Sequence, residues 1–250
     1  MKAMIFAAGL GTRLQPITNQ TPKALVEVGG EPLLGYQLKR LAHFGFTSIV
    51  VNVHHLGAQV KSFLSNFKIA GVEITISDES DMLLDTGGGL WNAASFFSDG
   101  EPFLVHNVDI LSNVDLGKLY QEHKTNNALA TLLVSERESS RHFLFNKMGQ
   151  LRGWENVKTG EKKLPCRLEE AMIPLAFSGI HVINPTIFSL HHQNGTFSII
   201  DVYLQLCCLN SIVAYKVSPE TIIHDIGTPQ KLEEANRMVS EGKFDQLISQ

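Results

Sequence analysis

The stretch that decides how this chain is interpreted is MIFAAGLGTRLQPITNQTPKALVEV, residues 4–28. A short apolar run ends there in a loop that carries Gly9, Gly11, Arg13 and, further along, Lys23. Glycine lets the backbone aim successive N–H groups at one anion. Arginine can bind phosphate oxygens through two parallel N–H groups, and lysine adds a compact charge. We therefore expect the loop to hold a phosphate group.

The loop matches neither of the two common phosphate-binding patterns. No Lys-Ser or Lys-Thr follows a glycine at the spacing of G-x-x-x-x-G-K-[ST]. In G-x-G-x-x-G the third glycine permits close packing of helix on strand, and Leu14 stands at that place here. A nicotinamide-dependent oxidoreductase is therefore a distant alternative. Two cations together with glycine amides suit a nucleoside triphosphate.

Composition excludes several classes of protein. The chain has 250 residues, 44% of them hydrophobic and 18% charged, which is typical of a globular domain with a sizeable core. Its net charge of −4 argues against a nucleic-acid or acidic-membrane partner, and no apolar run approaches a membrane span. We expect a cytoplasmic protein, and its oligomeric state stays open. The cysteines lack C-x-x-C spacing, which predicts reduced thiols, with Cys207 and Cys208 in the core of an apolar helix.

Hydrophobic periodicity predicts an α/β fold with a Rossmann-like, mostly parallel sheet, helices on both faces and a β-rich insertion. In the first half, strands alternate with helices and hairpin signals are absent. The segment from about 136 to 175 is polar and rich in turn residues, which indicates the insertion. The predicted strands are 2–7, 48–53, 72–77, 102–108, 128–134, 175–183 and 212–217, and the predicted helices are 32–45, 56–67, 87–97, 115–124, 198–210 and 229–242.

Two aspartates stand where strands are expected to end. Asp109 lies in LVHNVDI and Asp225 in IIHDIGTP. Ligands of such sheets bind beyond the carboxyl ends of the strands, and a bound triphosphate needs a divalent cation. Two carboxylates with phosphate oxygens are a typical Mg²⁺ ligand set. We therefore predict a Mg²⁺ site at Asp109 and Asp225.

At this point the motifs resemble a known family, the sugar-1-phosphate nucleotidylyltransferases (nucleotide-sugar pyrophosphorylases). The resemblance rests on AAGLGTRLQPIT…TPKALVEVGGEPLL, continues through Asp109 and reaches HDIGTPQKLEEAN. It implies a single nucleotidyltransferase domain over 1–250, with a nucleotide-binding half at 1–135 and a sugar-binding half at 136–250. Within the family, LLDTGGG and the short chain are most similar to N-acetylmuramate-1-phosphate uridylyltransferases. The mannose-1-phosphate and heptose-1-phosphate guanylyltransferases are similar over the same regions.

The resemblance also implies which residues form the site. The nucleoside triphosphate, UTP in the favoured interpretation, would be held by Ala8, Gly9, Gly11, Thr12, Arg13, Lys23, Thr86, Gly87 and Gly88. Arg13 and Lys23 would be catalytic, Asp109 and Asp225 would hold Mg²⁺, and Asn107, Ser178 and Gly179 would face the sugar. A pyrimidine suits a compact glycine-lined site, whereas Asp85 or Glu79 could present a carboxylate to guanine.

The implied reaction joins a sugar-1-phosphate to a nucleotide and releases pyrophosphate. The attacking phosphate oxygen is already ionised at neutral pH, so catalysis is positioning and charge stabilisation rather than general-base chemistry.

The sequence departs from the family pattern at two places. The family commonly has N-G-D before the first metal aspartate, and here Val108 replaces the glycine. A branched side chain there could narrow the pocket, which keeps open the alternative of a weakly catalytic nucleotide-sugar-binding regulator. The family's E-K-P segment is not evident. Lys162, Lys163 or Arg141 could substitute for the lysine of that segment, or the two lysines could belong to a solvated turn.

Overall fold

The computed structural model of the protein describes residues 1–166 and 171–244. The remaining part of the predicted insertion, residues 167–170, and the residues from 245 onward lie outside this description. The chain forms two compact units. The first unit contains Met1–Asp85, His106–Gly117 and the chain from Thr221 onward, and the second contains Thr86–Val105 and Lys118–Glu220. This division differs from the predicted halves, because the C-terminal segment joins the unit of the N-terminal loop.

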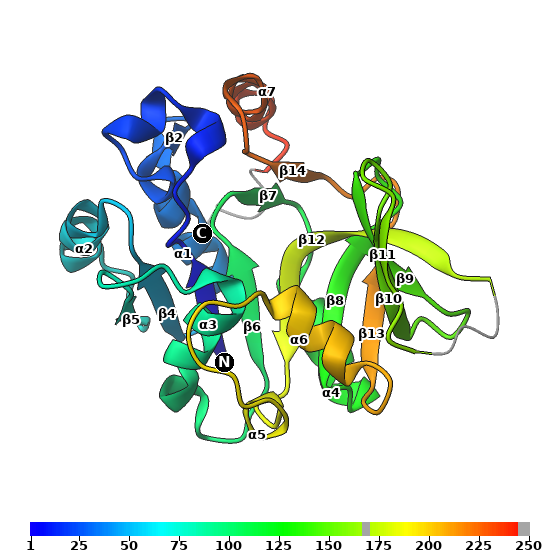
Figure 1. Cartoon of the computed structure of the whole chain (residues 1–250). Coiled ribbons are helices and arrows are strands. Elements are labelled where there is room, and N and C mark those ends of the chain that lie inside the picture. The colour runs from blue at the N-terminus through cyan, green and yellow to red at the C-terminus, as the bar shows by residue number, and fades with distance from the viewer. Residues whose placement is uncertain (167–170, 245–250) are drawn as a thin grey trace. The chain divides into compact units, whose positions relative to one another are not determined.

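A parallel sheet forms the centre of the first unit (Figure 1). Strand β1 (Lys2–Phe6) pairs in parallel with β4 (Ser48–Val53), and β4 pairs in parallel with β5 (Glu73–Asp78). The β-branched residues of β4 favour a strand whose two faces are both covered, and β4 is buried from Ile49 to Val53. Helices α1 (Leu33–His43) and α2 (Gly57–Asn66) lie between these strands in sequence. Gly45 has φ 82 and follows Phe44, the C-cap residue of α1, as the predicted helix terminus requires.

Short elements complete the first unit. The loop after β1 holds three 3₁₀ turns, η1 (Thr12–Leu14), η2 (Ile17–Asn19) and η3 (Lys23–Leu25). Two small antiparallel pairs follow, β2 (Glu27–Val28) with β3 (Glu31–Pro32) and β7 (Ile110–Ser112) with β14 (Ile223–Asp225). The chain then forms α7 (Pro229–Ser240), which Thr228 caps.

The second unit is largely antiparallel. Its strands are β8 (Ala130–Ser135), β9 (Arg141–Phe145), β10 (Leu151–Asn156), β11 (Glu161–Lys163), β12 (Ile173–Ile183) and β13 (Ile212–Lys216). The order is β11-β10-β9-β12, and β12 also pairs with β8, which pairs in parallel with β13. Gly149 and Gly160, both at positive φ, turn the chain between β9, β10 and β11. The structure therefore confirms the β-rich insertion.

The remaining helical and strand elements are mostly those the periodicity predicts. They are α3 (Asp85–Asn92), η4 (Ala94–Phe97), β6 (Phe103–Asn107), α4 (Leu116–Asn126), α5 (Ile187–Leu190) and α6 (Ile199–Leu206). The predicted helix 87–97 is in fact two elements, because hydrogen bonds spanning three residues tighten the chain at Ala93 and Phe96. None of the helices within the described ranges is long and apolar enough to cross a membrane.

The cysteines correct one expectation. Cys166 and Cys208 form a disulfide across a sequence separation of 42, and Cys208 is exposed rather than part of the core. Cys207 is the free, buried thiol, as the apolar helical pattern predicts. Periodicity failed at Cys208 because α6 ends at Leu206, so the residue after Cys207 no longer follows the helical face.

Candidate functional site

The predicted phosphate-binding loop, called here the phosphate-type loop, carries Gly9, Gly11, Arg13 and Lys23 and begins where β1 ends. The Ala7 N–H donates to Asn52 Oδ1 at 2.7 Å, which anchors the strand end to β4. Gly11 then adopts φ 64, and its carbonyl accepts from Thr18 Oγ1 at 2.8 Å and from the Leu14 N–H at 2.9 Å. A Cβ on Gly11 would lie 2.9 Å from the Thr18 methyl group. The second glycine of the loop is therefore required by both its backbone conformation and its neighbours.

Glu79 supports the end of β1 through Asn52, the residue that binds the Ala7 N–H. It is 3% exposed, and its Oε1 accepts from Asn52 Nδ2 at 2.7 Å while its Oε2 accepts from the Leu84 N–H at 3.3 Å. Burial raises the pKa of Glu79. Because both carboxylate oxygens are engaged within the protein, Glu79 serves the scaffold of the loop.

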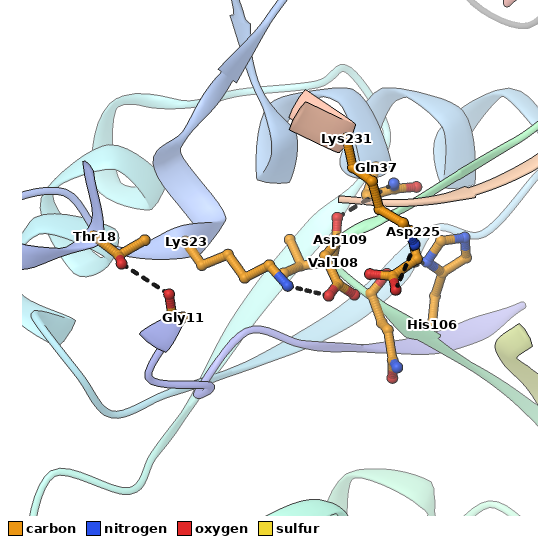
Figure 2. Close-up of polar contacts among 10 residues, drawn as sticks. Gly11, Thr18, Lys23, Gln37, His106, Val108, Asp109, Asp225 and Lys231 are labelled. Carbon is orange, nitrogen blue, oxygen red and sulfur yellow. Dashed lines mark hydrogen bonds and ion pairs between the residues drawn. The ribbon is translucent and has the colours of Figure 1, made fainter. Parts of the chain in front are cut away.

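Asp109 lies two residues after the end of β6 and faces Lys23 (Figure 2). The Lys23 ammonium and the Asp109 carboxylate form an ion pair whose side chains are only 12% and 17% exposed. The backbone around Asp109 is tied to its neighbours, since the Val108 N–H donates to the Phe6 carbonyl at 3.1 Å and the Asp109 carbonyl accepts from the Ile226 N–H at 2.9 Å. The structure thus brings the predicted lysine and the predicted first metal aspartate into contact.

The pairing of β14 with β7 brings Asp225 next to the segment that carries Asp109. It lies opposite Ile110, the residue after Asp109, in the antiparallel register. Lys231 Nζ, from the first part of α7, lies 3.3 Å from Asp225 Oδ2. Figure 2 shows the two aspartates between Lys23 and Lys231. Residues more than a hundred positions apart in the chain therefore form one cluster of two carboxylates and two ammonium groups.

Arg13 joins this cluster through the turn after Asp225. A Cβ built on Gly227 would lie 2.9 Å from Arg13 Nη1 and 3.0 Å from Arg13 Cζ. The guanidinium therefore packs on the backbone of Gly227 and fills the space that a side chain would take. This contact places the loop cation beside the turn that carries the second aspartate.

The donor set suits a hard divalent cation. The Asp109 and Asp225 side chains are 17% and 25% exposed, so their oxygens are partly shielded from water yet accessible. Carboxylate oxygens are the protein ligands that Mg²⁺ prefers, and each carboxylate is balanced here by a lysine ammonium group. The residues present thus fit a divalent ion together with an anionic ligand.

Comparison with known proteins identifies the family. A model of the nucleotidyl transferase family, described as "Nucleotidyl transferase", matches residues 2–242. The chain belongs to the nucleotidyl transferase family. The family assignment and the expectation of a nucleotidyl-transferring enzyme are thereby confirmed.

Among curated relatives, the chain is 32% identical to an N-acetylmuramate alpha-1-phosphate uridylyltransferase from Caulobacter vibrioides, over 96% of this chain and 97% of the relative. It is 45% identical to the enzyme of that name from Neisseria meningitidis over 48% of this chain, a match that spans only 52% of the relative's length. A mannose-1-phosphate guanyltransferase from Yarrowia lipolytica is 30% identical over 92% of this chain and 61% of its own length.

A solved UDP-glucose pyrophosphorylase from Acinetobacter baumannii matches with TM-score 0.79 and 18% identity, over 99% of this chain and 98% of that one. At that identity the likeness shows the fold alone. The mixed, mostly parallel sheet with helices that the sequence predicts is the fold of this pyrophosphorylase.

Val108 is the departure from the family's N-G-D pattern. It is 4% exposed, so its side chain lies in the core. Its φ is not among the positive values found in the described chain, so the position does not need the conformational freedom of glycine. The alternative of a weakly catalytic nucleotide-sugar-binding regulator stays a prediction.

The residues predicted to contact the base and the sugar lie in the second unit, with the exception of Asn107. Asn107 is the last residue of β6 and is half-buried. The Gly87 and Gly88 N–H groups donate to the Phe197 carbonyl at 2.8 and 3.2 Å, and Thr86 Oγ1 accepts from the Ile199 N–H at 3.1 Å. A Cβ on Gly87 would lie 2.8 Å from the Phe197 carbonyl oxygen, so this glycine is explained by packing. The roles of Thr86, Gly87 and Gly88 toward a nucleotide stay predictions that rest on the resemblance.

Ser178 and Gly179 lie on β12, where the register shifts and Gly179 has φ 71. Ser178 is 1% exposed, so its hydroxyl cannot contact a sugar in this conformation. Lys162 pairs with Glu155 at 3.0 Å, and Lys163 pairs with Asp201 at 2.8 Å. Both lysines lie on the exposed strand β11, as expected if they belong to a solvated segment. Arg141 is exposed at the start of β9.

Sequence reasoning missed three residues around Asp109 and Asp225. Lys231 pairs with Asp225, while Gln37 and Arg40 on α1 hydrogen-bond to the chain on either side of Asp109. The sequence carried only a weak indication of Gln37 and Arg40. Gln37 and Arg40 lie three positions apart, on one helical face, and both fall among the apolar positions of α1.

Proposed function

We propose that the chain transfers a nucleotidyl group from a nucleoside triphosphate to a sugar-1-phosphate and releases pyrophosphate. The observation that carries this proposal is the contact of Lys23 with Asp109 beside Asp225. A lysine, two carboxylates and the glycine loop meet in one unit, which is the combination that a metal-bound triphosphate requires.

In this proposal each residue of the first unit has a distinct task. The loop residues Ala8, Gly9, Gly11 and Thr12 bind the triphosphate, and Arg13 stabilises the departing pyrophosphate. Lys23 stabilises the negative charge that builds on the α-phosphate. Asp109 and Asp225 would hold Mg²⁺, which when bound offsets phosphate charge. The nucleophile is an ionised phosphate oxygen, so the site requires no general base.

We propose uridine as the base and N-acetylmuramate-1-phosphate as the sugar substrate. The relatives from Caulobacter and Neisseria bear that activity in their names and support the choice. The engagement of both Glu79 oxygens supports it as well, because a guanine site needs a free carboxylate. The Yarrowia relative keeps guanylyl transfer to mannose-1-phosphate as the second candidate.

We assign the choice of sugar to the second unit, chiefly to the insertion 136–175, with Asn107 and Gly179 as contacts. The insertion presents exposed charges, among them Arg141 and Lys162, which the first unit's site does not use. A chimaera that carries the insertion of a relative with a known sugar preference should adopt that preference. An unchanged preference in a folded and active chimaera would contradict this assignment.

The test of the function is a substrate panel. Purified protein is incubated with UTP, GTP, dTTP, ATP and CTP, each crossed with several sugar-1-phosphates, and pyrophosphate is measured with Mg²⁺ or with excess chelator. We expect release only when both substrates and Mg²⁺ are present, fastest with UTP and N-acetylmuramate-1-phosphate. Asp109→Asn should abolish it. Faster release with GTP and mannose-1-phosphate would select the second candidate, and binding without release would favour a regulator.

A further inference from the structure

Gln37 reaches from α1 to both sides of the first metal aspartate. Its side chain is fully buried, and Nε2 donates to the Ile110 carbonyl at 2.6 Å and approaches the Val108 carbonyl at 3.4 Å. These are the carbonyls of the residues directly before and after Asp109. Figure 2 shows Gln37 above Val108 and Asp109. One side-chain amide thus contacts the backbone on both sides of Asp109.

The chemistry of the contact requires a hydrogen-bond donor at position 37. Both partners are carbonyl oxygens, so the group that faces them must be a donor, which fixes the orientation of the Gln37 amide. The opposite atom, Oε1, is buried and has no hydrogen-bond partner among the residues that the structure describes. A buried polar atom without a partner is costly, so its cost must be offset by the two contacts that Nε2 makes.

Arg40, three positions further along α1, holds the flanks of the same segment. Its Nη1 lies 3.2 Å from His106 Nε2, and its Nη2 donates to the Val114 carbonyl at 2.5 Å. His106 in turn bonds through Nδ1 to the Asn107 carbonyl at 2.7 Å. Burial lowers the pKa of Arg40 to about 10, so the side chain stays cationic at neutral pH. The face of α1 that carries Gln37 and Arg40 therefore contacts the segment from before Asp109 to beyond β7.

We propose that Gln37 is a positioning residue that fixes the direction in which Asp109 presents its carboxylate to the divalent cation. The proposal rests on the proposed function, because it takes Asp109 to be a metal ligand. Metal ligands depend on the groups that orient them, and loss of such a group typically weakens metal binding about 10- to 100-fold. Asp109 lies between the end of β6 and the start of β7, its backbone segment contacts Phe6 and Ile226, and its carboxylate pairs with Lys23. The Gln37 amide adds a constraint on the backbone at both sides of Asp109.

The experiment measures metal binding separately from turnover. Gln37→Met keeps the length of the side chain but removes the donor, and Gln37→Glu replaces the donor with an acceptor facing two carbonyls. Leu38→Met, at a fully buried neighbour on α1, is the matched control for altered packing of the helix. Mn²⁺ binding to each folded variant is measured from the electron paramagnetic resonance of free Mn²⁺, with and without UTP, and thermal unfolding is recorded in chelator.

We expect Gln37→Met to weaken Mn²⁺ binding about 10-fold or more, and Gln37→Glu more strongly, while Leu38→Met stays within about 2-fold of wild type. In turnover assays, Gln37→Met should need about 10-fold more Mg²⁺ for half-maximal rate and recover most of the wild-type kcat at saturating Mg²⁺. A merely structural residue would instead reduce the active fraction and leave the metal dissociation constant unchanged.

Three outcomes would overturn the proposal. They are unchanged Mn²⁺ affinity in folded Gln37→Met, an equal loss in Leu38→Met, and wild-type Mn²⁺ binding that survives Asp109→Asn. Failure of the proposed function is distinguishable from these. If wild type binds Mn²⁺ through Asp109 and Gln37→Met weakens that binding, Gln37 keeps its role even where no substrate pair in the panel releases pyrophosphate.

Discussion

Arg13 packs against the backbone of Gly227, with its guanidinium in the space that a Cβ at position 227 would occupy. The phosphate-type loop and the turn after Asp225 therefore restrict each other. The position of the loop cation is set by a residue more than two hundred positions away in the chain. Glycine is needed at 227 for close approach rather than for an unusual backbone angle, since its φ is not among the positive values.

We expect Gly227→Ala to fold but to lose turnover. The flexible Arg13 can move away from the new methyl group, so the melting temperature should change by only a few degrees, whereas displacement of a phosphate-binding group by about 1 Å can cost about 100-fold in rate. The measurements are circular dichroism melting and steady-state kinetics. Gly57→Ala is the control, because a Cβ there would meet only Val53 at an ordinary 3.8 Å. Wild-type kcat in Gly227→Ala would show that Arg13 need not occupy this position.

Lys23→Ala should abolish most turnover while the protein still folds. It removes the cation nearest to Asp109, and loss of one preorganised charge contact to a transition state typically costs about 100- to 1,000-fold in rate. Arg13→Ala should lie in the same range. Lys39→Ala removes a lysine from an exposed pair with Glu31 and should leave the rate within about 2-fold of wild type. A folded Lys23→Ala with wild-type kcat would remove Lys23 from the mechanism.

The Cys166–Cys208 disulfide should stabilise the second unit. Closing a loop with a separation of 42 residues corresponds to about 4 kcal/mol in the chain-entropy treatment of disulfides. We expect dithiothreitol to lower the melting temperature of wild type and not that of Cys208→Ser. Cys207→Ala should retain the sensitivity, because its thiol takes no part in the bond. Titration of wild type unfolded without reductant should find a single thiol, and three thiols would contradict the disulfide.

Stability should fall on mild acidification because of buried histidines. Burial lowers the pKa of His123 from 6.5 to about 4 and that of His181 to about 3. Between pH 6.5 and these values the unfolded state binds protons that the folded state does not, so stability is lost as the pH falls. Each group should contribute about 2–3 kcal/mol between pH 7 and pH 4.5.

Urea unfolding at the two pH values tests this expectation, with His123→Gln and the exposed His192→Gln compared with wild type. The pH dependence should shrink in His123→Gln and stay in His192→Gln. An unchanged dependence in His123→Gln would mean that His123 already accepts a proton in the folded state.

The sequence by itself determined the alternation of strands and helices, the β-rich insertion and the loop chemistry of Gly9, Gly11, Arg13 and Lys23. These follow from local rules, since hydrophobic period, turn residues and glycine conformation act over a few residues along the chain. For the same reason the sequence could name Asp109 and Asp225 as strand-end carboxylates without showing that they meet. It also could not show that Cys166 and Cys208 pair, because pairing depends on distance in space rather than in sequence.

Only the tertiary structure decided how these groups are assembled. The β7–β14 pair brings Asp225 beside Asp109, and α1 turns Gln37 and Arg40 toward the segment that carries Asp109. Buried polar groups must find partners, and the partners here come from distant parts of the chain. That requirement explains why a glutamine and an arginine occupy core positions of an otherwise apolar helical face. Val108, at the position of the family's glycine, buries its side chain and places its carbonyl 3.4 Å from Gln37 Nε2.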